Sequence, residues 1–404
     1  MCLTAVVAGV PDPSGADIIS HVTTVLIAPQ EFKGSLTAAE AAGAIADGVR
    51  DALPDAHVVL QPMSDGGAGL VDALLSARGG ERLSARVHDP LMRAVDAAWA
   101  LLADGCAAIE MAAASGLVVL APGELDPMHA TTYGTGELIA AALDRGCAEI
   151  IVGVGGSATV DGGAGALQAL GSRLLDASGA GLPPGGAALA RLERIDLSAL
   201  DPRLSRARVR VATDVRNRLC GAEGAAAVFG PQKGASPEDI RVLDGALARF
   251  ADVARRDLGA DIASLDGGGA AGGLAAGLWL MGASIEPGFD LIASLVGLEA
   301  QVARADVVVT GEGRLDAQTA YGKTAAGVAR LARAHAKPVI AIAGTIADDH
   351  ARAAFDVALA ATPEGTTLID AIHAAARLVR TATARAMRAL TDVSDRRGSS
   401  LPSE

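Results

Sequence analysis

The sequence predicts an α/β protein in which both chain ends form one parallel-sheet domain and the middle forms a second, inserted domain. A length of 404 residues exceeds one simple core and indicates two domains. Half of the residues are hydrophobic but only 2% are aromatic, so Ala, Val, Leu and Ile must build the cores. Both ends alternate short apolar runs with helical patterns, which is typical of strands and helices in a parallel sheet.

The N-terminal end predicts a strand, a helix, a second strand and a second helix. The apolar run at residues 21–28 is the first strand. The helix is expected from Thr37 to Ala52, because Thr37 and Glu40 have the spacing of a capping box. A strand over residues 56–63 and a helix over residues 70–77 follow, which completes a βαβα pattern.

The C-terminal end repeats this pattern. The expected elements are, in chain order, a strand, a loop, a helix, two strands and one long final helix: residues 305–311, 312–324, 325–335, 337–344, 356–361 and 368–390. In the final helix, apolar residues from Leu368 to Leu390 recur at helical spacing. Both ends therefore predict the same class of domain.

The middle of the chain has a different pattern. Its predicted elements are short strands around turns, a helix, two further strands, and a helix capped by Ser236: residues 81–110, 136–145, 149–154, 209–213 and 237 onward. We therefore expect an α/β domain from residues 21–80 and 290–391, an inserted mixed α/β domain from residues 81–289, and loose tails at residues 1–20 and 392–404.

Charge and cysteine usage exclude several functional classes. A net charge of −13 and a pI near 5.0 repel nucleic acids and anionic membranes. The four cysteines show no CxxC pair and no histidine at metal-binding spacing, which predicts neither disulfides nor a zinc site. The apolar stretch at residues 3–10 lacks the basic flank of a signal peptide and is too short to cross a membrane. These features predict a cytoplasmic protein.

Five loops combine glycine with charged or hydroxyl groups, or follow a strand with an acid at its end: "EFKGS", "SDGGAG", "GGSATVDGG", "TDVRN" and "TGEGRLDAQTAYGK". Ligands of open parallel sheets bind at the carboxyl ends of strands, where most of these loops lie. Phosphoryl transfer needs backbone N–H groups, cations, carboxylates for Mg²⁺ and a base. The loops offer two lysines and five carboxylates for these roles: Lys33, Lys323, Asp65, Asp161, Asp214, Glu312 and Asp316.

Each of these features also has a structural interpretation. Lys33 is equally well explained as a solvated loop lysine, Asp65 as part of an Asx-turn, and Asp214 as a cap after its strand. The sequence "AYGKT" is not a P-loop, because Ala317 stands where the motif requires its first glycine.

The run "GVGGSATVDGGAG" matches a dinucleotide-binding fingerprint at Gly153, Gly155 and Ala158, with Asp176 about 20 residues further on. A nucleotide-dependent reductase is therefore another hypothesis for the function of this chain. The glycines after Asp161 would each weaken a helix by up to ~1 kcal/mol. We interpret the run as a ligand loop, with Asp161 at or near the N-terminus of the next helix.

Taken in order, eight motifs resemble the bacterial glycerate kinase family: "APQEFKGSLTAAEAA", "QPMSDGGAG", "IEMAAASGL", "TTYGTGELI", "GVGGSATVDGGAGALQALG", "FGPQKGA", "GAAGGL" and "TGEGRLDAQTAYGK". The resemblance covers about residues 21–378. It implies a flavodoxin-like domain formed by both chain ends, a mixed α/β domain inserted between them, and phosphorylation of D-glycerate by ATP with Mg²⁺. Glycerate and ATP are the implied partners, and a homodimer is left open.

The chain departs from the family pattern inside four of these loops. The departures are Gln30 and Glu31, Ala68 and Leu70, Val160, and Arg216 and Arg218, which mostly replace polar, acidic or proline positions. A relative without catalytic activity, which binds a small acid or a nucleotide as a sensor, is therefore the alternative hypothesis.

The kinase hypothesis assigns a role to each matching residue. Asp161 or Asp65 accepts the hydroxyl proton, and Lys33 lies on the transferred phosphoryl group or on the substrate carboxylate. The expected substrate and phosphate ligands are Ser35, Gly155, Gly156, Ser157, Thr159, Asn217 and Lys323. The expected metal and nucleotide ligands are Asp214, Glu312 and Asp316.

Overall fold

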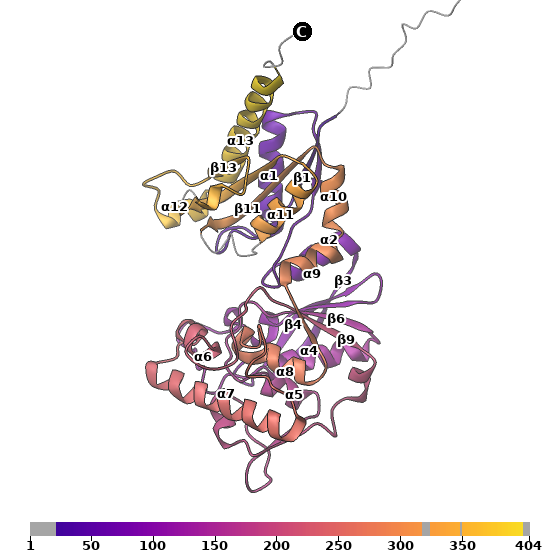
Figure 1. Ribbon diagram of the computed structural model, residues 1–404, viewed down its shortest axis with the longest axis vertical. Helices are drawn as coiled ribbons and strands as arrows, with labels where there is room; N and C mark the ends of the chain where they lie inside the picture. Colours follow the sequence, from indigo (N-terminus) through magenta and orange to yellow (C-terminus); the bar gives the residue numbers. More distant parts are fainter. Residues whose placement is uncertain (1–21, 317–323, 348–349, 399–404) are drawn as a thin grey trace, which may run out of the picture.

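The computed structural model describes residues 22–316, 324–347 and 350–398, and side chains up to residue 390. Figure 1 shows two α/β units one above the other: the upper unit contains both ends of the described chain, and the lower unit contains its middle. Lys323 and the first 21 residues lie outside the described ranges.

The upper unit is built on a five-stranded, fully parallel sheet. Its strand order is β13-β12-β11-β1-β2. The strands are β1 (Thr24–Ile27), β2 (His57–Leu60), β11 (Val307–Leu315), β12 (Val339–Ile346) and β13 (Val357–Ala360). Val25 of β1 pairs with Val307 on one side and Val58 on the other. The prediction that both chain ends share one parallel sheet is thus confirmed.

Helices cover both faces of this sheet because side chains along each buried strand alternate in direction. Val25 and Ile27 pack with α1 (Ala38–Ala52) and α13 (Ala375–Gly398). Leu26 and Ala28 pack on the opposite face into a cluster with α10 (Leu298–Arg304) and α11 (Thr324–Ala334). The same cluster continues to α9 (Gly288–Leu295) and to α2 (Leu70–Arg78), which packs mainly on strands of the lower unit. The predicted capping box opens α1, with the Thr37 hydroxyl accepting from the Glu40 N–H.

The lower unit contains a six-stranded mixed sheet of order β10-β9-β6-β5-β4-β3. Its strands are β3 (Gly80–His88), β4 (Ala94–Leu102), β5 (Ala107–Glu110), β6 (Glu149–Gly153), β9 (Arg208–Ala212) and β10 (Ser284–Glu286). The last four are parallel, while β3 and β4 form a nine-residue antiparallel pair where only short strands were expected. A separate hairpin pairs β7 (Arg173–Leu175) with β8 (Arg194–Asp196).

Six helices complete the lower unit: α3 (Ala112–Ser115), α4 (Tyr133–Asp144), α5 (Ala164–Ala169), α6 (Ala225–Phe229), α7 (Pro237–Leu258) and α8 (Leu274–Leu280). The Ser236 hydroxyl caps α7 as predicted. No helix in the described ranges is long and apolar enough to cross a bilayer.

Three predicted boundaries near the C-terminus are wrong. Strand β11 continues through Leu315, because Arg314 and Leu315 still pair with β12, so Glu312 lies in a strand and not in a loop. The expected final helix is two helices, α12 (Leu368–His373) and α13, because Ala374 leaves helical geometry. Helix α13 also continues to Gly398, where a loose tail was expected from residue 392.

Candidate active site

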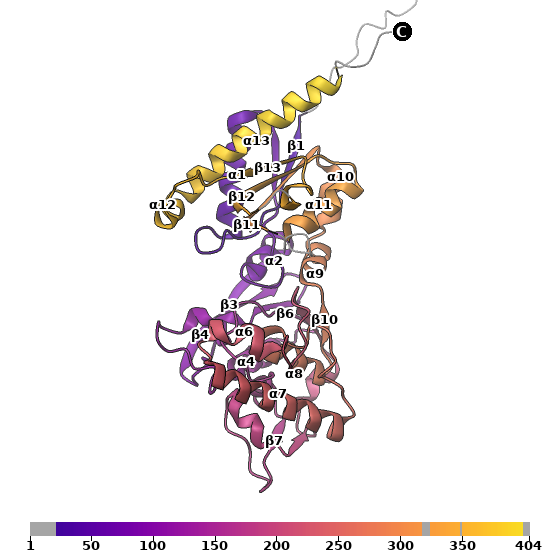
Figure 2. The same ribbon diagram turned by 60° about the vertical axis from the view of Figure 1, so that its left-hand side comes forward.

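The carboxyl ends of the parallel strands in the two units face each other. The loop after β2 contacts the loop after β6, where the Gly155 N–H donates to the Gly66 carbonyl over 3.1 Å. A side chain on Gly155 would place its Cβ 2.5 Å from the Cα of Gly67, so only glycine permits this contact. Two of the glycine-rich loops selected from the sequence therefore pack directly on one another, between the units seen in Figure 2.

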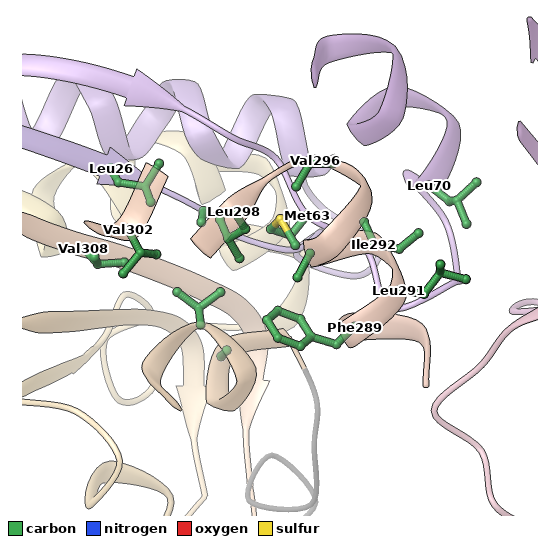
Figure 3. Packing of buried hydrophobic residues seen from close by; sticks show 14 of the residues in the cluster. Leu26, Met63, Leu70, Phe289, Leu291, Ile292, Val296, Leu298, Val302 and Val308 are labelled. Atoms are coloured by element: carbon green, nitrogen blue, oxygen red, sulfur yellow. The ribbon is translucent and has the colours of Figure 1, made fainter. Parts of the chain in front are cut away.

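One hydrophobic cluster runs beneath these loops. It includes Leu26 and Met63 from the upper unit, Ala212 at the end of β9, and residues of α9 such as Phe289 and Ile292. Figure 3 shows the α9 side chains between Leu70 and the strand that carries Leu26. This shared core fixes α9, and hence the loops at its N-terminus, relative to the upper sheet.

Three carboxylates follow three different strands at this junction: Glu31 after β1, Asp65 after β2 and Asp214 after β9. Burial, reinforced by the Asp65 carboxylate, raises the pKa of Asp214 to about 7. Burial also raises the pKa of Glu31, which the Lys33 ammonium opposes and the Asp65 carboxylate reinforces. Lys33, Glu31, Asp65 and Asp214 thus form a series of charged groups that interact across the junction.

Asp214 is the most constrained member of this series. Its Oδ1 accepts from the N–H groups of Gly288, at 2.8 Å, and Phe289, at 3.4 Å, which begin helix α9. Its Oδ2 is buried and has no hydrogen-bond partner among the described residues. Asp214 can therefore cap helix α9 with Oδ1 and still bind a ligand with Oδ2.

Lys33 and Ser35 lie in the loop between β1 and α1. The Ser35 hydroxyl donates to the Phe32 carbonyl over 2.8 Å and stabilises the turn. Lys33 is exposed on the rim of a cavity of about 320 Å³ at the carboxyl ends of β11 and β12. Asp65 forms the expected Asx-turn through the Gly67 N–H, and it stays partly exposed.

A second cavity, of about 340 Å³, opens beside Asp214 at the ends of β9 and β10. Arg216 and Arg330 line it, each paired with a carboxylate, Asp266 and Asp290 respectively. The Arg330 guanidinium also lies 5.9 Å from the centre of the Phe289 ring. Guanidinium groups match a carboxylate geometrically, so a small organic acid can pair with these arginines if it shares or displaces Asp266 or Asp290.

The loop from Ser157 to Asp161 is held from behind by a buried lysine. The ammonium of Lys233 donates to the Ser157 hydroxyl and to the Thr159 carbonyl, both over 2.7 Å. Lys233 is 1% exposed, and burial lowers its pKa to about 7. The Thr159 hydroxyl is buried without a partner among the described residues.

Asp161 is 0% exposed and lies just before helix α5, as predicted. Its carboxylate accepts from five donors, which are the Thr131 hydroxyl, both the N–H and the hydroxyl of Thr132, and the N–H groups of Gly163 and Gly165. Burial raises its pKa, and the backbone and hydroxyl donors oppose that rise. A substrate hydroxyl cannot reach this carboxylate in the present conformation.

The remaining candidates are not gathered around one point. Asn217 donates from its side chain to the Glu223 carbonyl over 2.8 Å, and Glu312 is buried within β11. Asp316 lies 3.6 Å from the Arg314 guanidinium. In the part of the chain that the structure describes, no three His, Cys, Asp or Glu side chains form a group that could hold a metal by themselves.

Lys233 was not selected from the sequence, although it lies within "FGPQKGA". The only local feature that could have marked Lys233 as functional is its position between Pro231 and Gly234, in a chain with very few lysines. Its acceptors lie more than 70 residues earlier in the chain. Sequence spacing alone could not pair them.

Comparison with known proteins identifies the family. A model of the glycerate kinase family matches residues 25–391. Glycerate kinase from Haemophilus influenzae is 49% identical over 327 residues, which are 80% of this chain and 86% of that protein. Glycerate 2-kinase from Escherichia coli is 46% identical with the same coverage. A crystal structure named for glycerate kinase 2 from Salmonella typhimurium LT2 aligns with a TM-score of 0.82 at 46% identity, covering 93% of this chain and all of that one. The chain therefore belongs to the glycerate kinase family.

Proposed function

We propose that this protein transfers the γ-phosphoryl group of ATP to a hydroxyl of glycerate. The observation that carries the proposal is the junction itself, where Lys33, Asp65 and Asp214 come from the carboxyl ends of strands in two facing sheets. Phosphoryl transfer depends mainly on holding charged groups in place around the two reacting oxygens. A junction between two units suits a reaction in which a group is transferred from one substrate to another.

Each exposed or partly exposed charged group has a separate role in the proposed reaction. The ammonium of Lys33 stabilises the negative charge that develops on the transferred phosphoryl group. Asp65, which is partly exposed, accepts the proton of the attacking hydroxyl. Arg216 and Arg330 bind the carboxylate of glycerate in the cavity beside Asp214. The guanidinium of Arg216, where the family usually has an acidic or polar residue, then supports binding of an acid.

We assign Asp161 to positioning rather than to proton transfer. Five donors already occupy its two oxygens, and none of its side chain is exposed. Its role is to hold the loop that carries Gly155, Gly156, Ser157 and Thr159. Gly156 is exposed on that loop and can contact substrate oxygens, whereas Ser157 and Thr159 are buried and the Gly155 N–H already donates to the Gly66 carbonyl.

The residues fit Mg²⁺ at Asp214. Magnesium in kinases is usually held by one or two carboxylates together with phosphate oxygens and water, so a three-carboxylate group is not required. Asp214 Oδ2 is buried and unpartnered among the described residues, and Asp65 is the carboxylate that raises the pKa of Asp214 most. When bound there, Mg²⁺ would neutralise charge on the phosphates of ATP.

An assay of ADP release with glycerate tests the proposal, and phosphorus NMR of the product identifies the hydroxyl. We infer attack by the 2-hydroxyl, because a relative at 46% identity is named glycerate 2-kinase. Wild-type protein that is folded but releases no ADP with glycerate would refute the enzyme and leave the sensor alternative. A 3-phosphoglycerate product would refute the choice of hydroxyl alone.

A further inference from the structure

The cavity beside Lys33 combines three features that suit a nucleotide. It lies at the carboxyl ends of β11 and β12, next to the loop that follows β1. Strands β1 and β11 are neighbours in the sheet, but the chain continues from β1 toward β2 and from β11 toward β12, on opposite sides. Loops that diverge in this way open a crevice in which ligands of parallel sheets bind.

The walls of this cavity differ in chemistry. One side presents backbone and hydroxyl groups at the strand ends, including Gly313, Gly344 and Thr345. The opposite side presents apolar side chains from α12, Leu368 and Ile372. A flat aromatic base with polar edges matches a slot with one apolar and one polar wall.

Charge separates this cavity from the one beside Asp214. Among the described residues that line the cavity at α12, Lys33 is the only charged one. The cavity beside Asp214 is lined by four carboxylates and two arginines. In a chain of net charge −13, the site whose charge is purely positive is the better one for a triphosphate.

The apolar wall is also unusually exposed. Leu368 is 76% exposed, and its neighbour Ile369, which does not line the cavity, is 67% exposed. Both occupy the first turn of α12, after the Thr367 cap. The leucine therefore has no packing role in the described structure that would account for its position.

We propose that the cavity between α12 and the ends of β11 and β12 binds the base and ribose of ATP, with Lys33 directing the phosphates toward Asp65 and Asp214. The proposal rests on the proposed function, because ATP is taken to be the phosphoryl donor. It adds the location of the nucleotide, with Leu368 and Ile372 as the contacts to its base.

Two substitutions and a matched control test the site. Leu368→Asp places a charge on the apolar wall, and Ala371→Trp fills the cavity without adding charge. Ile369→Asp makes the same change one residue along, on a side chain that does not line the cavity. An acidic residue in the first turn favours a helix, so neither aspartate should unfold α12.

We expect Leu368→Asp and Ala371→Trp to raise the KM for ATP about tenfold or more, as befits the loss of one well-packed contact surface. The KM for glycerate, and kcat at saturating ATP, should stay within twofold of wild type. Ile369→Asp should match wild type throughout. Wild-type ATP affinity in either cavity variant, or an equal loss in Ile369→Asp, would overturn the proposal.

Titration of each variant with a fluorescent N-methylanthraniloyl ATP, without glycerate, separates this proposal from the proposed function. If wild type binds the probe and the cavity variants do not, the base site holds even where ADP release is absent. If wild type turns over glycerate and all variants bind the probe equally, the base site is wrong and the kinase remains.

Discussion

The buried amine of Lys233 makes a prediction that can be worked out in magnitude. Lys233→Met keeps the length and apolar volume of the side chain but removes both 2.7 Å hydrogen bonds, to Ser157 and Thr159. Each such bond contributes about 1 kcal/mol net, and more when a buried acceptor is left unpaired. Above about pH 10.5, where the lysine is uncharged in both the folded and the unfolded chain, we therefore expect the substitution to lower the free energy of unfolding by about 2–3 kcal/mol.

The effect of this substitution depends on pH. Burial lowers the pKa of Lys233 from 10.5 to about 7 in the folded protein, whereas the unfolded chain keeps the ordinary value. Between these two values the unfolded chain binds the extra proton, so the stability of wild type rises with pH by about 1.4 kcal/mol per unit. Below the folded pKa both states are protonated, and this contribution is lost. Between about pH 7 and pH 10.5 the unfolding free energy of wild type therefore changes by about 5 kcal/mol in total. The unfolding free energy of Lys233→Met lacks this pH dependence.

Urea denaturation followed by tryptophan fluorescence measures the difference. The only two tryptophans, Trp99 and Trp279, lie in β4 and α8 of the lower unit, which also contains Lys233. From pH 7.5 to 9.5 the unfolding free energy of wild type minus that of Lys233→Met should rise by about 2–3 kcal/mol, and wild type should become the more stable of the two only toward the upper end of this range. Ser157→Ala is the control, since it loses an acceptor but keeps the pH slope. Parallel stability curves for wild type and Lys233→Met would refute the reasoning.

Three further predictions concern the junction. Asp214→Asn should lower kcat about 100-fold or more if Asp214 holds Mg²⁺, and unchanged turnover at saturating Mg²⁺ would contradict that role. Gly155→Ala should lower the melting temperature and kcat/KM, because its Cβ would lie 2.5 Å from Gly67; Gly181→Ala, with no atom near its Cβ, is the matched control and should be silent in calorimetry and assay. Asp161→Asn should lower the unfolding free energy by about 3 kcal/mol, because its amide N–H groups would face donors; a loss of turnover with unchanged stability would instead restore Asp161 as a catalytic base.

Local sequence signals predicted the parts of the fold that depend on neighbouring residues. The capping box at Thr37 and the serine cap at Ser236 lie where the spacing placed them, since a cap needs only residues three positions apart. Asp161 also precedes its helix, and its carboxylate accepts from the N–H groups of Gly163 and Gly165, two and four residues further on. The continuation of β11 and the break before α13 were missed, because pairing with β12 and packing against α1 override local pattern.

The sequence by itself therefore determined the fold class and the family, and it selected the loops that we propose to carry the chemistry. Apolar periodicity, caps and ordered motifs are encoded in short stretches of chain. Only the tertiary structure decided which loop groups are exposed. It buried Asp161 under five donors, placed Lys233 behind the glycine loop, and left Lys33, Asp65 and Asp214 at the junction of two sheets. Burial and long-range pairing depend on contacts between residues far apart in the chain, which no local pattern specifies.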